Sequence, residues 1–260
     1  MKENRRINKY TIIGAVSILS FLLIWQLVIQ FGVLSEKILP APTKVFATLF
    51  DKLSNPKPDG SILQTNILVS LKVACSGLFL AIIIGVPMGW LMGWYKPFNR
   101  FVRPLFEFMR PIPPIAWIPL TILWVGIGLE AKAMIIFFAS FIPCVINANA
   151  GIKSTSPVLI NVAKTFGASN FTIFLKMGIP SSLPLTFAGI RIALNSAWST
   201  LVAAELLAAN AGVGYMISMG RQFGRVDIIV LGMVCIGLLG FIFSWVFSKL
   251  ERFFVKWRTV

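Results

Sequence analysis

The sequence contains no histidine, and its three cysteines, Cys75, Cys144 and Cys235, each stand alone within an apolar segment. Histidine and clustered cysteine are the usual ligands of zinc and haem iron in proteins, and histidine is the usual base of a catalytic triad. A disulfide framework, a zinc or haem site and a histidine-dependent hydrolase are therefore excluded. We expect this chain to carry neither a metal site nor a catalytic residue.

A nucleotide-binding loop is also missing. The nearest approach to GxxxxGK[ST] runs from Gly151 to Ser154, and it lacks the preceding glycine at the required spacing. No GxGxxG after a strand, no calcium-binding loop and no HExxH motif occurs. The chain thus holds no cofactor of its own and does not hydrolyse ATP by that mechanism. If it takes part in transport, the energy comes from an ion gradient or from another subunit.

Acidic residues are scarce, with 9 aspartates and glutamates against 24 lysines and arginines. Hydrophobic residues make up 57% of the chain and its mean hydropathy is +0.84, whereas soluble domains are about 45–50% apolar. The sequence is therefore typical of an integral membrane protein. Its basic residues are distributed among loops between apolar segments, which favours charge-driven membrane orientation over nucleic-acid binding.

Six apolar segments predict an all-α protein with six transmembrane helices, since a span needs about 20 residues. They cover residues 10–31, 68–94, 113–128, 133–150, 183–209 and 228–249. No small-residue cleavage site follows the first, so we expect a retained span and not a signal peptide. The third is short and rich in proline, and its start can lie as early as residue 102.

Basic residues predict the orientation of these segments. With the N-terminus inside, fifteen lysines and arginines fall in the inner segments and eight in the outer ones. This asymmetry predicts that both termini are cytoplasmic. The long loop 32–66 is then external, with a short helix over residues 43–52.

A weakly polar insert, residues 156–191, separates the fourth and fifth apolar runs. Ser156 as a side-chain cap and Pro157 predict the start of a short helix, and Gly167 predicts its end. Asn170 predicts the start of a second helix, residues 171–177, which ends before the next proline. Along the first helix, apolar side chains share one face: Val158, Leu159, Val162 and Phe166. Both helices are too short to span a membrane, so we expect a cytoplasmic segment with one face free for another protein.

Three features inside the apolar segments suggest functional elements, and each has a structural alternative. Four prolines between residues 110 and 128 predict a broken helix, which is either a transport pathway or a structural kink. Arg191 and Glu205 lie in the fifth segment as buried charges, which either serve transport or form interhelical pairs. The second segment carries a stripe of glycines for helix packing within the molecule or between subunits: Gly77, Gly85, Gly89 and Gly93.

The insert resembles the cytoplasmic signature of permeases in ATP-binding-cassette importers, which reads EAA, three residues, G, nine residues and I-x-LP. The residues in register are Asn161, Val162, Ala163, Gly167, Met177, Ile179 and Pro180. Ala163, Gly167 and Pro180 match, whereas Asn161 replaces the glutamate and Val162 replaces the first alanine.

The surrounding segments RPIPPIAWIPLTILWVGIG, FGASNFTIFLKMGIPSSLPLTFAGIRIALNSAWSTLVAAELLAANAGVGYMI and GRQFGRVD resemble the permeases of nitrate, sulfonate and taurine importers. The resemblance covers residues 61–251. It implies a first span and external loop over residues 1–60, a permease domain over 61–251, and a basic cytoplasmic tail over 252–260.

The resemblance further implies a type I importer in the bacterial inner membrane. Its partners would be a second copy of the permease, two ATPase subunits that hydrolyse ATP with Mg, and an external solute-binding protein that delivers a small anion such as sulfonate, taurine or nitrate. The residues expected to couple to the ATPase are Asn161, Val162, Ala163, Lys164, Thr165, Phe166, Gly167 and Ala168. Those expected to line the path are Pro114, Trp117, Arg191, Asn195, Trp198, Ser199 and Glu205. The alternative function is a gradient-driven secondary transporter, for which Glu205 is the single candidate carboxylate.

Overall fold

The computed structural model describes residues 9–207 and 209–254, and all regular elements in these residues are helices. The chain forms two compact units. Unit 1 comprises residues Met1–Gln64 and Met216–Cys235, and unit 2 comprises Thr65–Tyr215 and Ile236–Val260. The N-terminal residues 1–8 and most of the predicted C-terminal tail, residues 255–260, lie outside the described residues.

Five helices are long and apolar enough to cross a membrane. They are α1 (Lys9–Gln30), α3 (Leu63–Trp94), α6 (Leu129–Lys153), α9 (Ile179–Leu207) and α11 (Val226–Phe254). The remaining predicted segment, the third, belongs to a broken pair, in which α4 (Lys96–Met109) is bent by 86° relative to the helical stretch Pro114–Val125. The all-α class is confirmed, and the span number is six when this pair counts as one.

The glycine stripe of α3 packs against α6 within unit 2. A Cβ atom on Gly77 would lie 2.7 Å from Ile136 Cβ, and one on Gly89 would lie 2.7 Å from Ala148 Cβ. Such distances leave no room for a side chain, so only glycine permits this approach. Packing within the molecule is therefore the use of this stripe in the structure. Because positions along both helices increase together, α3 and α6 run parallel.

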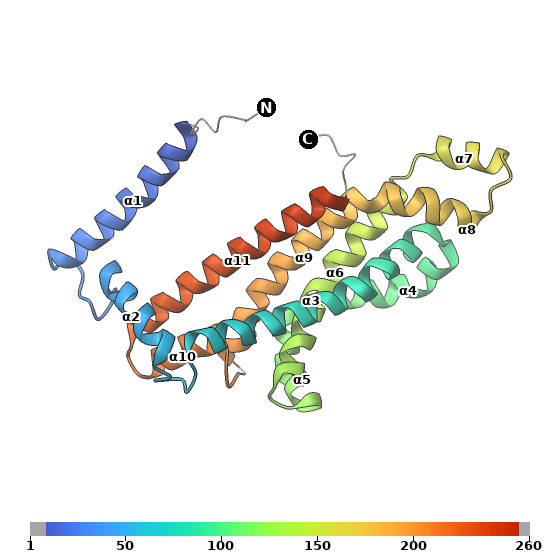
Figure 1. Ribbon diagram of the computed structural model, residues 1–260. Helices are drawn as coiled ribbons and strands as arrows, with labels where there is room; N and C mark the ends of the chain where they lie inside the picture. The colour runs from blue at the N-terminus through green and yellow to red at the C-terminus, as the bar shows by residue number, and fades with distance from the viewer. Residues whose placement is uncertain (1–8, 208, 255–260) are drawn as a thin grey trace. The chain divides into compact units, whose positions relative to one another are not determined.

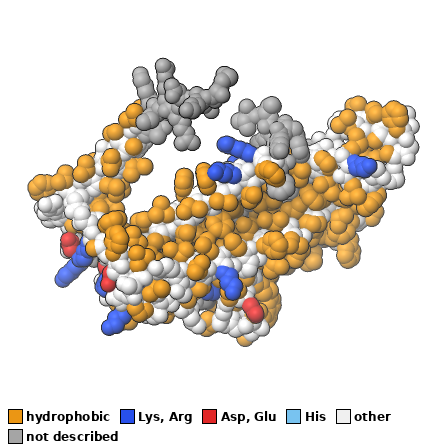
Figure 2. Space-filling model, in the orientation of Figure 1, with side chains coloured by type: hydrophobic (Ala, Val, Ile, Leu, Met, Phe, Trp, Pro, Cys, Tyr) orange, Lys and Arg blue, Asp and Glu red, His pale blue; other side chains and the backbone are white. Residues whose placement is uncertain are grey.

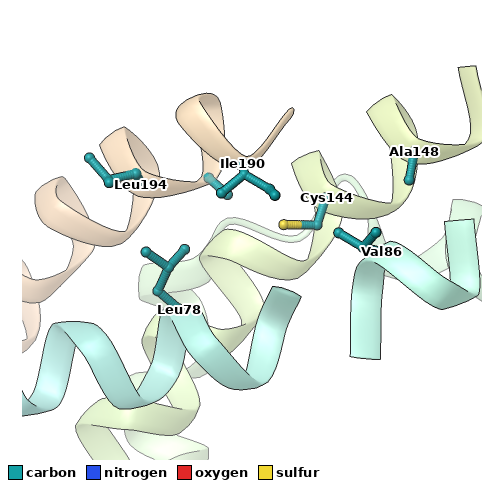
Figure 3. Packing of buried hydrophobic residues seen from close by; sticks show 7 residues of the cluster. Leu78, Val86, Cys144, Ala148, Ile190 and Leu194 are labelled. Carbon is teal, nitrogen blue, oxygen red and sulfur yellow. The ribbon is translucent and has the colours of Figure 1, made fainter. Parts of the chain in front are cut away.

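Helix α9 lies antiparallel to α6 in the same unit, and the part of α11 from residue 236 lies antiparallel to α9 (Figure 1). Ser140 Oγ of α6 donates to the Ala193 carbonyl of α9 at 3.3 Å. The indole nitrogen of Trp198 donates to the Ile236 carbonyl at 3.1 Å. Figure 3 shows the shared apolar core, with side chains from α3, α6 and α9: Leu78, Val86, Cys144, Ala148, Ile190 and Leu194.

These directions bring one set of helix ends together in unit 2. The C-terminal ends of α3, α6 and α11 and the N-terminal end of α9 lie at the same end, which we call the basic end. It carries the basic residues Lys96, Arg100, Lys153, Lys164, Lys176, Lys249 and Arg252. Hydrophobic side chains cover most of the visible surface over α3 and α11 (Figure 2), as expected for helices that face lipid.

Two charges counted with the outer loops lie inside helices instead. Lys72 lies in α3, inside the predicted segment 68–94, and Lys132 lies in α6 because that helix begins before its apolar run does. The Lys132 side chain is buried and donates to the Ala211 carbonyl at 3.4 Å. Arg191 and Glu205 are therefore not the only charges within the long helices.

Unit 1 contains the predicted loop helix as α2 (Pro42–Ser54). Its buried face includes Lys52, whose ammonium is enclosed by the Asp59 carboxylate and backbone carbonyls such as Ser61 O at 2.7 Å. Thr48 Oγ1 donates to Asp227 Oδ2 at 2.8 Å, and Asp227 also binds the Arg225 guanidinium. These contacts fix α2 against the start of α11.

Candidate coupling segment and translocation path

The insert begins with α7 (Pro157–Thr165). Ser156 occupies the N-cap position, but its side chain makes no capping hydrogen bond, so that part of the prediction is wrong. Pro157 with its fixed φ suffices to start the helix. Gly167 has φ +78°, a left-handed conformation that suits glycine, and it ends the helix as predicted.

The apolar face of α7 is exposed. No α7 residue is buried, and the exposed fractions of Val158 and Phe166 are 69% and 86%. Figure 1 shows α7 standing apart from the packed helices of unit 2, beyond α8 (Asn170–Ile173). The predicted coupling residues 161–168 form the second half of α7 and the turn after it. A short helix with an uncovered apolar face is suited to a protein partner.

The second predicted helix does not end before Pro180. Ser169, and not Asn170, caps it, because Ser169 Oγ accepts from the Thr172 backbone N–H at 3.2 Å. The helix continues from α8 through a π-helical stretch, Phe174–Gly178, directly into α9. The wider π turn relieves the clash and the missing donor that Pro180 introduces. Residues 170–207 therefore form one continuous helical rod.

The start of this rod is attached to the end of α3. Trp94 Nε1 donates to Asn170 Oδ1 at 3.2 Å, and the Trp94 and Phe174 rings lie 5.6 Å apart. A Cβ atom on Gly178 would lie 3.1 Å from the Trp94 ring. We call this contact the Trp94 clamp. Sequence reasoning missed it, because Asn170 was interpreted as a helix cap.

The proline-rich segment forms the predicted break. After α4 ends, Pro114–Trp117 forms a 3-10 turn (η1), and α5 (Ile118–Val125) follows. A hollow of about 530 Å³, here called the break hollow, lies between this break, α6 and α9. It is lined by Arg110, Pro111, Ile112, Pro113, Pro114, Phe138, Ala139, Ile142, Pro143, Asn195, Ser196, Ser199 and Thr200. Three predicted path residues thus meet here: Pro114, Asn195 and Ser199.

The break hollow combines one cation with neutral polar groups. The Arg110 side chain is about half exposed, and its nearest carboxylate, Glu107, is 3.6 Å away. Asn195 and Ser199 line the hollow, and Ser199 Oγ donates to the Asn195 backbone carbonyl at 3.1 Å. A guanidinium beside hydroxyl and amide groups is suited to bind a small anion. From the sequence, Arg110 was counted with an inner loop. In the structure it directly follows α4 and lies about 21 Å along the helix from Lys96.

Four other predicted path residues lie outside the lining of this hollow. Trp117 stacks on Phe138 with ring centroids 4.6 Å apart, behind the lining. Trp198 faces α11, where it also stacks on Phe243 at 5.7 Å. Arg191 pairs with Glu251 of α11, so its charge is already neutralised.

Glu205 is the fourth, and it is 1% exposed. Its carboxylate accepts from Ser70 Oγ at 2.7 and 2.9 Å and from the Gly214 backbone N–H at 2.8 Å. Ser70 Oγ in turn accepts from the Val213 N–H at 2.9 Å. Glu205 thus fixes the turn before α10 (Val213–Gln222). Both charges of α9 form the interhelical contacts that the structural alternative predicts.

Within the described ranges 9–207 and 209–254, no three His, Cys, Asp or Glu side chains come together as a metal site.

Comparison with known proteins identifies the family. The profile of the "Binding-protein-dependent transport system inner membrane component" family matches residues 81–257. The chain belongs to this family. It is 34% identical to the taurine transport system permease protein TauC of Escherichia coli, over 95% of this chain and 89% of TauC. It is 31% identical to the bicarbonate transport system permease protein CmpB of Synechocystis, over 90% of this chain and 85% of CmpB.

The fold is also that of a solved importer permease. A chain from inward-facing conformations of the MetNI methionine ABC transporter aligns with a TM-score of 0.64. The alignment covers 74% of this chain and 96% of that one, at 20% identity. The chain is thus a multi-pass inner-membrane permease subunit of an ATP-binding-cassette importer and has no catalytic role of its own. This family membership excludes the alternative of a gradient-driven secondary transporter.

Proposed function

We propose that the chain forms the translocation path for a small oxyanion such as a sulfonate, taurine, nitrate or bicarbonate, and that the break hollow receives it. Permeases for taurine and for bicarbonate are among its relatives. A solute-binding protein delivers the anion from outside. Two ATPase subunits hydrolyse ATP with Mg to drive a pair of these permeases.

The observation that carries the substrate class is Arg110 at the break. Irregular backbone within a membrane is tolerated where it lines a cavity, and broken helices of transporters form binding sites there. Arg110 contributes a permanent positive charge at this point, opposite Asn195 and Ser199. Arg191, the arginine expected from the sequence to line the path, is already paired with Glu251. Arg110 is therefore the better candidate for the charge that meets the anion.

The partner arrangement rests on other features. Residues 161–168 with the exposed face of α7 are the proposed contact with the ATPase, and the basic end of unit 2 is the proposed cytoplasmic end, with both termini on that side. The permease domain is proposed to cover residues 61–251. Residues 1–60 are proposed to add a span and an external loop, and 252–260 a basic tail.

The test is uptake by the complete importer, reconstituted in proteoliposomes with its ATPase and binding protein. We expect Arg110→Gln to lower the uptake rate of the transported anion by about fivefold to tenfold, because one favourable charge interaction is lost. Arg110→Lys should retain most of the activity, since the charge remains. Arg100→Gln, which removes a charge from α4 outside the hollow, is the matched control. Equal uptake by Arg110→Gln and the unaltered protein would overturn the proposal.

A further inference from the structure

A second hollow lies next to the break hollow in unit 2, between α4 and α6. Its volume is about 260 Å³. We call it the α4–α6 furrow, and it is lined by Met92, Asn99, Arg103, Phe106, Glu107, Arg110, Val145, Ile146, Asn149, Ala150 and Lys153. Arg110 lines both hollows. The furrow therefore meets the break hollow at this arginine and extends toward Lys153 at the basic end.

The polar part of the furrow follows from the sequence of α4. Asn99, Arg103, Glu107 and Arg110 are spaced by four, four and three residues, which places them on one face of a helix. This stripe is about 16 Å long. Exposed apolar side chains occupy another face of the same helix: Phe101, Leu105 and Phe108. Helix α4 thus presents lipid-compatible residues on one side and a charged stripe on another.

The charges of the furrow are unequal in number. Arg103, Arg110 and Lys153 give three positive charges, and Glu107 gives one negative charge, so the net charge is +2. Glu107 lies 3.7 Å from Arg103 and 3.6 Å from Arg110, in ion pairs that are substantially exposed. Such pairs contribute little to stability. The small stabilising effect of these pairs does not explain why two arginines lie along a membrane helix.

Charged side chains at membrane depth are costly unless they face water or partners. The wall opposite α4 supplies polar groups as well as apolar ones, because Asn149 and Lys153 of α6 line the furrow. Asn149 Oδ1 is buried and has no hydrogen-bond partner among the described residues. A buried polar atom of this kind requires water or a ligand. Both observations indicate a furrow that is filled with water.

We propose that the α4–α6 furrow is a hydrated anion passage, through which the small oxyanion leaves the break hollow toward the basic end. This inference rests on the proposed function, since it gives the exit for the same substrate. Arg110 hands the anion to Arg103, about 10 Å along the same face of the helix, and Lys153 lies at the mouth. Binding is weak at each step because the cations are exposed, and a weak, repeated site favours release over retention.

Thiol labelling tests the passage without transport. The full complex in proteoliposomes carries Ile146→Cys, a neutral furrow position about 10 Å along α6 from Lys153, in a Cys75→Ser background. The probes are an anionic and a cationic methanethiosulfonate, applied from the side of the basic end. Ser181→Cys, exposed and neutral in the first turn of α9 and outside the coupling residues 161–168, gives the reference ratio of the two rates. Leu105→Cys, on the exposed apolar side of α4, is the lipid-facing control.

We expect Ile146→Cys to react, with an anionic-to-cationic rate ratio about fivefold above that of Ser181→Cys. Leu105→Cys should remain unlabelled. Adding Arg103→Gln should lower the ratio at Ile146→Cys, and adding Glu107→Gln should raise it. Failure of Ile146→Cys to react would overturn the passage, and a ratio equal to the reference would overturn its preference for anions.

Uptake separates this inference from the proposed function. Arg103→Gln should slow uptake by about fivefold, with Arg100→Gln unchanged. Slow uptake in Arg110→Gln together with normal uptake in Arg103→Gln would support the break hollow as the anion site. It would overturn the furrow as the exit passage. Normal uptake in both variants would overturn the proposed function itself, whatever the labelling shows.

Discussion

The two charges of α9 have partners on other helices that lie far away in the sequence. Glu205 binds Ser70, 135 positions earlier, and Arg191 binds Glu251, 60 positions later. Each pairing satisfies a charge that would otherwise be costly within a membrane. The charge stripe on α4 differs, because its ion pairs join close neighbours in the sequence, at 3.7 and 3.6 Å. This difference separates charges held between helices from candidates for transport.

The Glu205 contacts predict a loss of stability on substitution. Glu205→Ala removes the acceptor for the Gly214 N–H and the Ser70 hydroxyl and leaves both buried. We expect the free energy of unfolding to fall by about 3 kcal/mol, measured by denaturation in detergent. Glu205→Gln keeps one acceptor oxygen and should lose less. A stability unchanged by Glu205→Ala would show that the turn before α10 is held by other contacts.

Sequence reasoning at this scale found the unusual residues but not their partners. Hydropathy alone marks Arg191 and Glu205 as costly within a span, so both were recognised. Whether such a charge is neutralised depends on side chains from other helices, which no local pattern encodes. Arg110 was missed for the opposite reason, because proximity to prolines made it look like a loop residue. The four prolines beside it were the available signal, since they predict a break inside the membrane.

Among the helices, the insert and α9 act as one element. The chain from Asn170 to Leu207 is continuous, and only the turn at Gly167 separates it from α7. The Trp94 clamp attaches the start of this rod to α3. A displacement of α7 would therefore reach α9 through one short turn and α3 through one aromatic contact.

The exposed face of α7 predicts the effect of a charge placed on it. Phe166→Asp should weaken binding of the ATPase subunit by about tenfold or more, because a large apolar side chain loses its buried site. The permease should still insert, since Phe166 packs on no core of the chain. Copurification of the ATPase with tagged permease measures this. Phe166→Leu, which keeps the face apolar, should retain the ATPase, and undiminished copurification with Phe166→Asp would remove α7 from the interface.

The presence of the helices could be predicted from the sequence, whereas it could not be predicted which neighbouring helices join without a break. The glycine after α7 and the prolines after α4 gave the stop and the break. Pro180 looked like another stop, but the π turn before it lets the helix continue. A π turn carries no sequence signal as clear as proline, because it depends on packing against Trp94 and its neighbours. The glycine stripe of α3 predicted a close approach, and the structure supplied its partner, α6.

For the whole molecule, the distribution of basic residues predicts the orientation in the membrane. The positive-inside rule places the basic end of unit 2 in the cytoplasm and the loop after α1 outside. Lys72 and Lys132 were assigned to loops in error, and both lie within helices. Removing them from the outer set strengthens the asymmetry.

Labelling of intact cells tests this orientation. In a Cys75→Ser background, Lys57→Cys in the outer loop should react with a membrane-impermeant maleimide. Lys96→Cys at the basic end should react only after the membrane is permeabilised. Both positions are exposed and lie outside the proposed ATPase contact, so packing does not limit their reaction. The reverse pattern would place the basic end outside and would exclude a contact of α7 with a cytoplasmic ATPase.

Hydropathy was sufficient to predict the all-α class and the positions of the long apolar helices at this scale. The separation into two compact units was not predicted, because it depends on contacts such as Lys52 with Asp59 and Thr48 with Asp227. Those side chains looked like ordinary charges and hydroxyls of an external loop.

The backbone contact between α3 and α6 limits how this permease can change its conformation. At each of the four glycines, a carbonyl oxygen of α6 lies between 2.5 and 3.2 Å from the place of a Cβ atom, so the two backbones are in direct contact there. Movement of one helix against the other would require clashes that a close-packed interface does not permit. We therefore expect alternating access to move α3 and α6 together as a rigid body, with the joints at the α4–α5 break and the turn at Gly167.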